Sequence, residues 1–251
     1  MTPPGDHYLW PCAGRTPMLV IAVSIVATLL FFNLFPQVDI AVSSLFFKEG
    51  ICIATGQICG MFPLSSSQVF GPIRQFLQAL PVVLAILLLA AIAWRVLSRR
   101  SFTHPFDRAG LAAVATMIIG AGVFVNLIFK EHWGRPRPYM TDLFGGPYPF
   151  VPAGHITDYC ASNCSFVSGE AASAFWLVAL ASLAPIRFRI PALIAAVVVA
   201  SATSLLRVAF GGHYLSDVIL GALVSLLIFT ILATVARTLA LRHAGQQIIG
   251  N

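Results

Sequence analysis

The chain has 251 residues, of which 58% are hydrophobic and only 10% are charged. Soluble domains carry about 25% charged residues, so this composition excludes an ordinary soluble protein. It predicts an all-α, polytopic membrane helix bundle. The net charge of +6 at pH 7 follows from membrane topology and from a basic cluster described below, and we expect no nucleic-acid partner.

Six apolar stretches approach the length needed to cross a bilayer, which is about 20 mostly apolar residues. They comprise residues 18–35, 76–97, 109–129, 166–184, 190–210 and 215–239. No internal repeat or low-complexity tract is evident, so we expect one integral-membrane domain over residues 1–251. The first stretch is too long for the apolar core of a signal peptide, and we expect it to be retained.

Lys and Arg are distributed unequally between the two sides of such a bundle. Six spans place both termini on one side, and that side carries nine of the 15 basic residues. These nine are Arg15, Arg95, Arg99, Arg100, Arg108, Arg187, Arg189, Arg237 and Arg242. The positive-inside rule therefore predicts cytoplasmic termini, with a tail at residues 1–17, and an outward face toward the periplasm or its equivalent.

Two outward, periplasmic loops are long, at residues 36–71 and 130–165. The apolar segment at residues 38–47 in the first loop suits a short helix. This helix either lies in the membrane interface or packs over the bundle. Prolines in the second loop exclude a long helix there, and we expect the loop to cap or line a site.

Four of the five cysteines fall in these outward loops, at Cys52, Cys59, Cys160 and Cys164. An oxidising compartment favours disulfides, and we expect the local pairs Cys52–Cys59 and Cys160–Cys164. The alternative is a zinc site formed by Cys160, Cys164, His155 and Asp158, although this spacing matches no common ligand pattern.

Three groups of polar residues lie at the borders of the apolar stretches. The first contains Lys130, Arg135 and Arg137. Basic residues at span ends often anchor to lipid headgroups, but that role is more usual on the cytoplasmic side. Arg presents a planar fork to phosphate oxygens and Lys adds a point charge, so this group also fits a phosphate site.

The second group, Ser168, Gly169 and Glu170, opens the fourth span. A helix capped here by Asn163 or Ser165 would point its first backbone N–H groups outward as an anion site. Small residues at this place also permit close helix packing, which is the simpler explanation. Glu170 is a functional candidate because an ionisable residue in a span is costly; its alternative role is an ion pair with one of the arginines.

The third group contains Arg207, His213 and Asp217. His213 and Asp217 are four residues apart and share a helical face. An Asp that accepts a hydrogen bond from one imidazole nitrogen leaves the other nitrogen free as nucleophile or base. A lone histidine is more often structural, but this pair beside an arginine at a membrane border favours a functional site.

Together, these groups resemble the type 2 phosphatidic acid phosphatase superfamily. Its three blocks occur in family order, as Lys-x6-Arg-Pro from Lys130, Ser-Gly at Ser168, and Arg-x5-His-x3-Asp from Arg207. The resemblance extends over residues 76–239, and the six-span layout agrees with it.

The resemblance implies a phosphatase that needs no metal and no other cofactor. His213 would attack phosphorus and form a phosphohistidine, which water then hydrolyses, and Asp217 would orient His213. The phosphate oxygens would be held by Lys130, Arg137, Ser168, Gly169 and Arg207. Phosphoryl transfer depends mostly on positioning and positive charge, which these residues supply.

One position departs from the family. The family's middle block reads Pro-Ser-Gly-His, and its His protonates the leaving group, whereas this chain has Glu170. A carboxylic acid serves the same purpose when desolvation favours its protonated form, so Glu170 is the first candidate for the general acid. His155, in a Pro-Ala-Gly-His segment, is the second candidate, and an inactive relative is the third possibility.

An outward site at the membrane surface implies a phosphorylated membrane lipid as the substrate and the bilayer as a partner. Residues 35–47 and 62–64, together with the Ser-Phe-Val-Ser-Gly-Glu block, resemble bacterial lipid A 4′-phosphatases. We therefore expect removal of a phosphate from lipid A or its precursor. The alternatives are undecaprenyl diphosphate or phosphatidylglycerol phosphate as substrate, a related phosphotransferase, and an anion or lipid transporter, which would need no His213–Asp217 pair.

Overall fold

The computed structural model describes residues 13–51, 58–99 and 105–249. Within these residues, five helices are long and apolar enough to cross a membrane. They are α1 (Arg15–Leu34), α3 (Phe70–Arg99), a continuous helix formed by α4 (Pro105–Thr116), η3 (Met117–Phe129) and α5 (Lys130–His132), then α8 (Ile186–Ala209) and α9 (Leu215–Ile249). The expected all-α, multi-pass membrane bundle is confirmed.

The fourth predicted span is shorter than the apolar sequence indicates. It consists of α6 (Gly169–Phe175) and α7 (Leu177–Ser182). At a rise of about 1.5 Å per residue these helices extend about 21 Å, less than the roughly 30 Å of a bilayer core. The helix starts late because Ser168 has an extended backbone and acts as its N-cap. Since α3, η3, α8 and α9 surround α6, the segment does not need to match the bilayer thickness.

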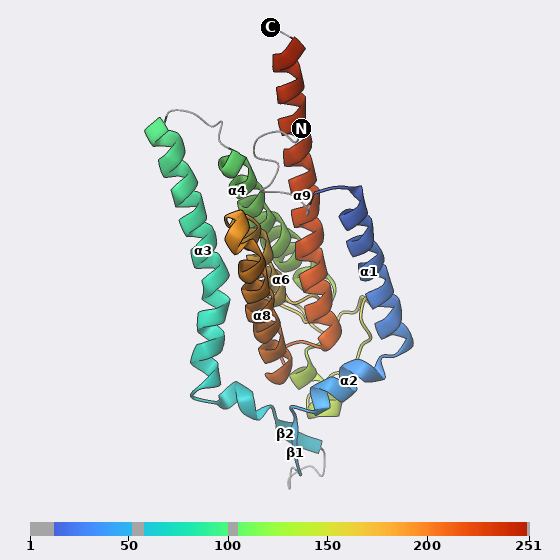
Figure 1. The fold of residues 1–251 in the computed structure, drawn as a ribbon. Coiled ribbons are helices and arrows are strands. Elements are labelled where there is room, and N and C mark those ends of the chain that lie inside the picture. The colour runs from blue at the N-terminus through green and yellow to red at the C-terminus, as the bar shows by residue number, and fades with distance from the viewer. Residues whose placement is uncertain (1–12, 52–57, 100–104, 250–251) are drawn as a thin grey trace.

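Successive passes of the chain run in opposite directions. α1 begins at the same end of the bundle at which α9 ends (Figure 1). Five long passes and one short pass account for this arrangement. The loops that precede α3 and α6 gather at the opposite end, which we call the loop end (Figure 1).

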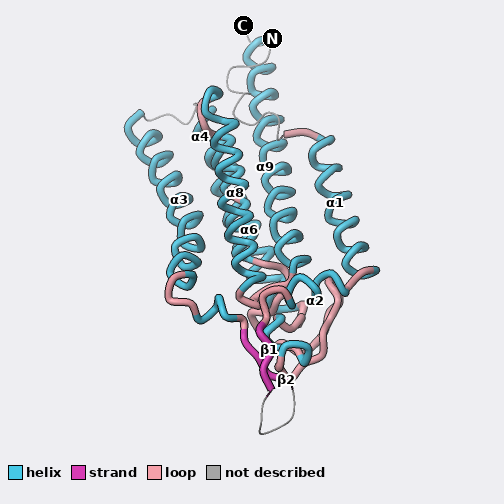
Figure 2. Tube along the Cα trace, turned by 60° about the horizontal axis from the view of Figure 1, so that its bottom comes forward, coloured by secondary structure: helices cyan, strands magenta, loops and turns pink. Residues whose placement is uncertain are grey.

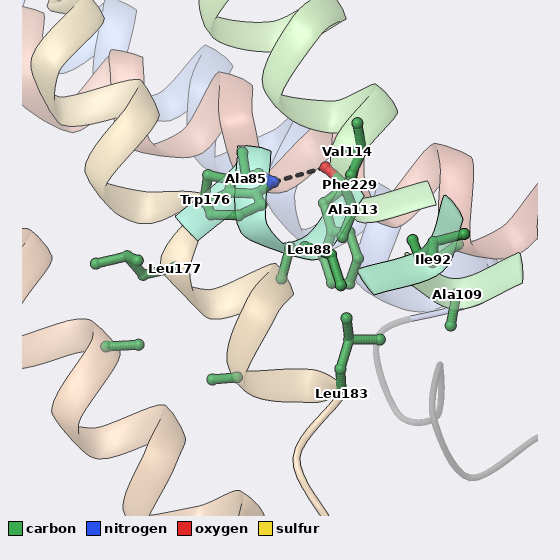
Figure 3. Close-up of a cluster of buried hydrophobic side chains, with 14 of the residues drawn as sticks. Ala85, Leu88, Ile92, Ala109, Ala113, Val114, Trp176, Leu177, Leu183 and Phe229 are labelled. Atoms are coloured by element: carbon green, nitrogen blue, oxygen red, sulfur yellow. Dashed lines mark hydrogen bonds between the residues drawn. The ribbon is translucent and has the colours of Figure 1, made fainter. Parts of the chain in front are cut away.

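The packing around α6 depends on small residues and one large aromatic side chain. Ala171, Ala172 and Ala174 are fully buried, and their small size allows α8 and α9 to approach closely. Trp176, between α6 and α7, is 1% exposed and donates a hydrogen bond from Nε1 to the carbonyl of Ala113 at 2.6 Å (Figure 3). Leu88 of α3 belongs to the same cluster of apolar side chains (Figure 3).

The outer faces of α1 and α3 are apolar and exposed. Leu19, Val23 and Leu30 of α1 are 64%, 63% and 58% exposed. Contiguous apolar surface of this kind is unfavourable in water, so lipid is the environment that suits these faces.

The first long loop forms a cover over the loop end. α2 (Gln37–Ser44) packs against α8 and α9 and buries Asp39 and Ser43, so the expected short helix packs over the bundle. β1 (Lys48–Ile51) and β2 (Ile58–Met61) then pair antiparallel (Figure 2), and η2 (Pro63–Ser66) leads into α3. The hairpin was not predicted because its short strands lack a clear alternation of apolar and polar residues.

The second long loop is irregular apart from two short turns, η4 (Pro138–Met140) and η5 (Asp142–Phe144). A disulfide joins Cys160 and Cys164, as expected, and it removes both sulfur ligands of the alternative zinc site. Cys52, half of the other expected pair, lies outside the described residues.

Candidate active site

A fully buried arginine lies next to the candidate site. Arg135 Nη1 donates to Asp217 Oδ1 at 2.6 Å and to Ser216 Oγ at 2.9 Å. Its Nη2 donates to Asp39 Oδ2 at 2.9 Å, and its Nε donates to the carbonyl of Val151 at 2.9 Å. All three guanidinium nitrogens are therefore engaged by protein acceptors. Arg135, a secondary candidate for phosphate binding, has the contacts of a structural residue.

Asp39 completes this buried network from α2. Its Oδ1 accepts from the backbone N–H of Ser216 at 2.8 Å, and its Oδ2 accepts from Ser216 Oγ at 2.5 Å. A buried carboxylate is costly unless it is paired and hydrogen-bonded, and Arg135 provides the opposite charge. Asp39 was missed as a functional residue because its sequence signal was a single acidic residue between Val38 and Ile40.

The predicted hydrogen bond between His213 and Asp217 is absent. His213 Nδ1 lies 3.9 Å from Asp217 Oδ2 and instead bonds the carbonyl of Ser165 at 2.8 Å. Since a carbonyl only accepts, Nδ1 carries the hydrogen and Nε2 keeps a free lone pair. The carboxylate of Asp217 is drawn to Arg135 and to Ser165 Oγ, which donates to Oδ2 at 2.5 Å. Asp217 therefore orients His213 through Ser165.

Burial and positive charge keep His213 neutral. Burial lowers the pKa of His213 well below its ordinary value of 6.5, and the charges of Arg207, Arg137 and Lys130 lower it further. These three basic groups are therefore close enough to act on the imidazole. The fold brings together residues that belong to separate blocks of the sequence.

Asn163 holds the two basic residues of the first block. Arg137 Nη2 donates to both the backbone carbonyl and the side-chain Oδ1 of Asn163, each at 2.8 Å. Lys130 Nζ donates to the same Oδ1 at 3.4 Å. The backbone φ of Asn163 is 51°, a left-handed conformation that asparagine tolerates better than most residues. The disulfide between Cys160 and Cys164 encloses this residue.

Ser168 and Gly169 begin α6 beside Lys130. Ser168 Oγ accepts from the backbone N–H of Ala171 at 3.3 Å, so the cap is Ser168 and not one of the two upstream residues that we expected. A Cβ at Gly169 would lie 3.3 Å from Lys130 Nζ and 2.9 Å from Asn126 Oδ1. Glycine therefore allows the ammonium group to lie against the first turn of the helix.

Arg207, at the end of α8, has a guanidinium with unused donors. Its side chain is 6% exposed and packs on Gly212, where a Cβ would lie 2.5 Å from Nη2. Within the described residues, this guanidinium makes no hydrogen bond, and its buried Nε lies 3.2 Å from Glu170 Oε1 without hydrogen-bond geometry. Buried donors without acceptors are costly, and phosphate oxygens would satisfy them.

Glu170 is held by arginines from two helices. Arg74 of α3 donates from Nε to Oε2 at 3.1 Å and from Nη2 to Oε1, and Arg207 lies on its other side. Two parallel bonds of this kind fix a carboxylate strongly. The ion pair considered as an alternative role for Glu170 is present, and its main partner, Arg74, was given no role from the sequence.

His155 lies against another part of the bundle. Its Nε2 and Asn33 Oδ1 of α1 are hydrogen-bonded at 2.7 Å. α1 and α3, which carries Arg74, stand on opposite sides of the bundle (Figures 1 and 2). The structure therefore separates His155 from the Glu170–Arg74 pair.

A cavity of about 520 Å³ leads to the site from the loop end. Its lining includes Arg74, Arg137, Tyr139, Arg207 and Gly212. Three guanidinium groups at one cavity favour an anionic ligand. Within the part of the chain that the structure describes, no group of three or more His, Cys, Asp or Glu residues is placed to hold a metal ion.

The sequence profile of the PAP2 superfamily matches residues 110–240, which contain all three blocks. A lipid A 4′-phosphatase of Rhizobium leguminosarum is 44% identical over 216 residues, covering 82% of this chain and 90% of that protein. A lipid A 4′-phosphatase of Francisella tularensis subsp. novicida is 33% identical over 191 residues, covering 76% of this chain and 82% of that protein. No solved structure matches the chain significantly. The family match, together with relatives that are aligned over most of their length, shows that the chain belongs to the PAP2 superfamily of phosphatases.

Proposed function

We propose that this chain removes the 4′-phosphate of lipid A, with His213 as the nucleophile. The observation that carries the chemistry is the buried His213, whose Nδ1 is occupied by the Ser165 carbonyl and whose neutral ring lies among three basic groups. The relatives named lipid A 4′-phosphatase support the choice of substrate.

The reaction proceeds in two steps. His213 Nε2 attacks phosphorus, so that an N–P bond forms while the bond between phosphorus and the sugar oxygen breaks. Water then attacks the phosphohistidine and the N–P bond breaks, while the Glu170 carboxylate left by the first step takes a proton from the water; inorganic phosphate is released and the imidazole is restored. The charge on the transferring group is stabilised by Lys130, Arg137 and Arg207, with further donors at Ser168 Oγ and the Gly169 N–H.

The departing sugar oxygen requires a proton, and Glu170 is the proposed donor. Its carboxylate is held by Arg74 and Arg207. A bound phosphate competes with Glu170 for Arg207, so the Glu170 carboxyl lies beside the phosphate in the proposed complex. His155 lacks this proximity, since its hydrogen bond is with Asn33.

The proposed location is the bacterial inner membrane, with the loop end in the periplasm. The support is the excess of Arg at the end that carries both termini. A substrate lipid in the outer leaflet would then reach the site without crossing the bilayer.

The test is phosphate release by the purified protein in detergent with EDTA present. Lipid A, undecaprenyl diphosphate and phosphatidylglycerol phosphate are compared, with His213→Ala as the inactive variant. His132→Ala is the matched control, because His132 is exposed and bonds only the carbonyl of Ile128 in its own helix. We expect release from lipid A that survives EDTA and is lost in His213→Ala alone. Preference for another lipid would overturn the substrate, and release by His213→Ala would overturn the mechanism.

A further inference from the structure

A second cavity reaches the site from the side of the bundle. It has a volume of about 650 Å³ and is lined by α3, η3 and α6. Lys130, Gly169 and Glu170 line it near the loop end, and the apolar side chains of Val82 and Ile118 line it deeper in the membrane. The cavity borders the lipid-facing surface, because Val82 and Ile118 are 48% and 59% exposed.

Two carboxamides interrupt this apolar lining. Gln78 of α3 and Asn126 of η3 both line the cavity, and both belong to helices that cross the membrane. Both side chains are exposed, and neither makes a hydrogen bond to any residue that the structure describes. An amide without a partner in hydrocarbon costs free energy. A ligand that supplies the partner would offset this cost.

The two carboxamides lie at the depth expected for the ester or amide linkages of an acylated phospholipid or glycolipid. Gln78 follows Arg74 by four residues along α3, and Asn126 precedes Lys130 by four residues, so each lies about one turn below the charged layer. Below them the lining is apolar. A phosphorylated lipid presents its phosphate, its ester or amide linkages and its acyl chains in the same order.

We propose that Gln78 and Asn126 form a subsite for the ester and amide linkages of the lipid substrate, whose phosphate lies at His213. The inference rests on the proposed function, because the phosphate of the same molecule fixes the depth at which the linkages lie. A carboxamide both donates and accepts hydrogen bonds, so it pairs with an ester carbonyl or with either end of an amide. The acyl chains then leave the cavity between α3 and η3 into the bilayer.

The experiment measures the Kd of lipid A in detergent for protein carrying His213→Ala, which prevents turnover. Asn126→Leu and Gln78→Met are added to this background, because each replaces a carboxamide by an apolar group of similar size. Each change should raise the Kd about fivefold, the size expected for one neutral hydrogen bond, and both together about 25-fold if the two sites are independent. Ser24→Leu is the matched control, because Ser24 is a partly exposed polar residue of α1 whose hydroxyl donates to the carbonyl of Val20 in its own helix.

The outcomes separate this inference from the proposed function. If the enzyme with native His213 releases phosphate from lipid A, but the Kd is unchanged in both carboxamide variants, the subsite alone is overturned. Absence of release from lipid A overturns the proposed function, and the subsite with it. Dissociation of an oligomer by Asn126→Leu or Gln78→Met, with an unchanged Kd, would show that a second copy of the chain occupies the groove, and it would also overturn the subsite.

Discussion

At the scale of single residues, the chemistry depends on which imidazole nitrogen of His213 is free. The Ser165 carbonyl accepts a hydrogen bond from His213 Nδ1 at 2.8 Å, which leaves Nε2 free for the proposed attack on phosphorus. Asp217 contributes by holding Ser165 Oγ at 2.5 Å. The proposed nucleophile is thus held by a backbone carbonyl, and Asp217 is linked to it only through Ser165.

The general acid can be identified by the choice of leaving group. Glu170→Gln should lower kcat for lipid A by roughly 10²–10⁴-fold, the usual contribution of general acid catalysis. The same variant should retain most activity toward an aryl phosphate, whose leaving group departs without a proton. His155→Ala should keep kcat within about threefold, because no contact places His155 at the site. An equal loss of activity toward both substrates in Glu170→Gln would show that Glu170 has a structural role through its pairing with Arg74.

The lowered pKa of His213 determines how activity and stability are expected to depend on pH. Protonation of the imidazole removes the nucleophile, and burial with three nearby positive charges moves that protonation well below pH 6.5. The profile of kcat/KM, corrected for ionisation of the substrate phosphate, should stay flat as the pH falls through 6.5. An acid limb with an apparent pKa at or above 6.5 that belongs to the enzyme would contradict this assignment. Stability should fall with pH below 6.5, since the unfolded chain binds this proton more readily.

At the scale of elements, the buried network of Asp39, Arg135 and Asp217 joins α2, the second long loop and the start of α9. The contacts that join these three segments span large separations in sequence, from 81 residues for Arg135–Ser216 to 177 for Asp39–Ser216. Sequence patterns report neighbours along one helix, so none of these pairs was predictable from spacing. The network fixes the cover of the loop end above the site.

Removal of Asp39 should therefore destabilise the protein strongly. Asp39→Ala leaves Arg135 with less opposite charge and leaves the donors of Ser216 without an acceptor, for an expected loss of about 3–5 kcal/mol. Thermal unfolding in detergent should show a clear decrease in Tm. Asp142→Ala is the control, because Asp142 is exposed and its carboxylate, among the described residues, accepts a hydrogen bond only from the adjacent backbone N–H of Leu143. An equal Tm for Asp39→Ala and Asp142→Ala would exclude a stabilising role for the network.

At the scale of the whole molecule, the direction of insertion decides which lipid leaflet supplies the substrate. α1 begins and α9 ends at one end of the bundle (Figure 1), and the charged residues that line the two cavities lie toward the loop end. In the expected orientation, green fluorescent protein fused after Asn251 should fluoresce, and alkaline phosphatase fused at the same position should be inactive. Alkaline phosphatase fused after Leu45 should be active. The reverse pattern would place the site in the cytoplasm.

The sequence by itself determined the class of the molecule, its approximate spans and the three blocks that carry phosphate chemistry, since these depend on hydrophobicity and on residues close together in the chain. It also indicated the Cys160–Cys164 disulfide, whose partners are four residues apart. Only the tertiary structure decided that Arg135 is committed to Asp39 and Asp217, that Arg74 holds Glu170, and that His155 faces α1. The physical reason is that buried charges are stable only with partners, and the partners in this fold come from helices that are distant in sequence.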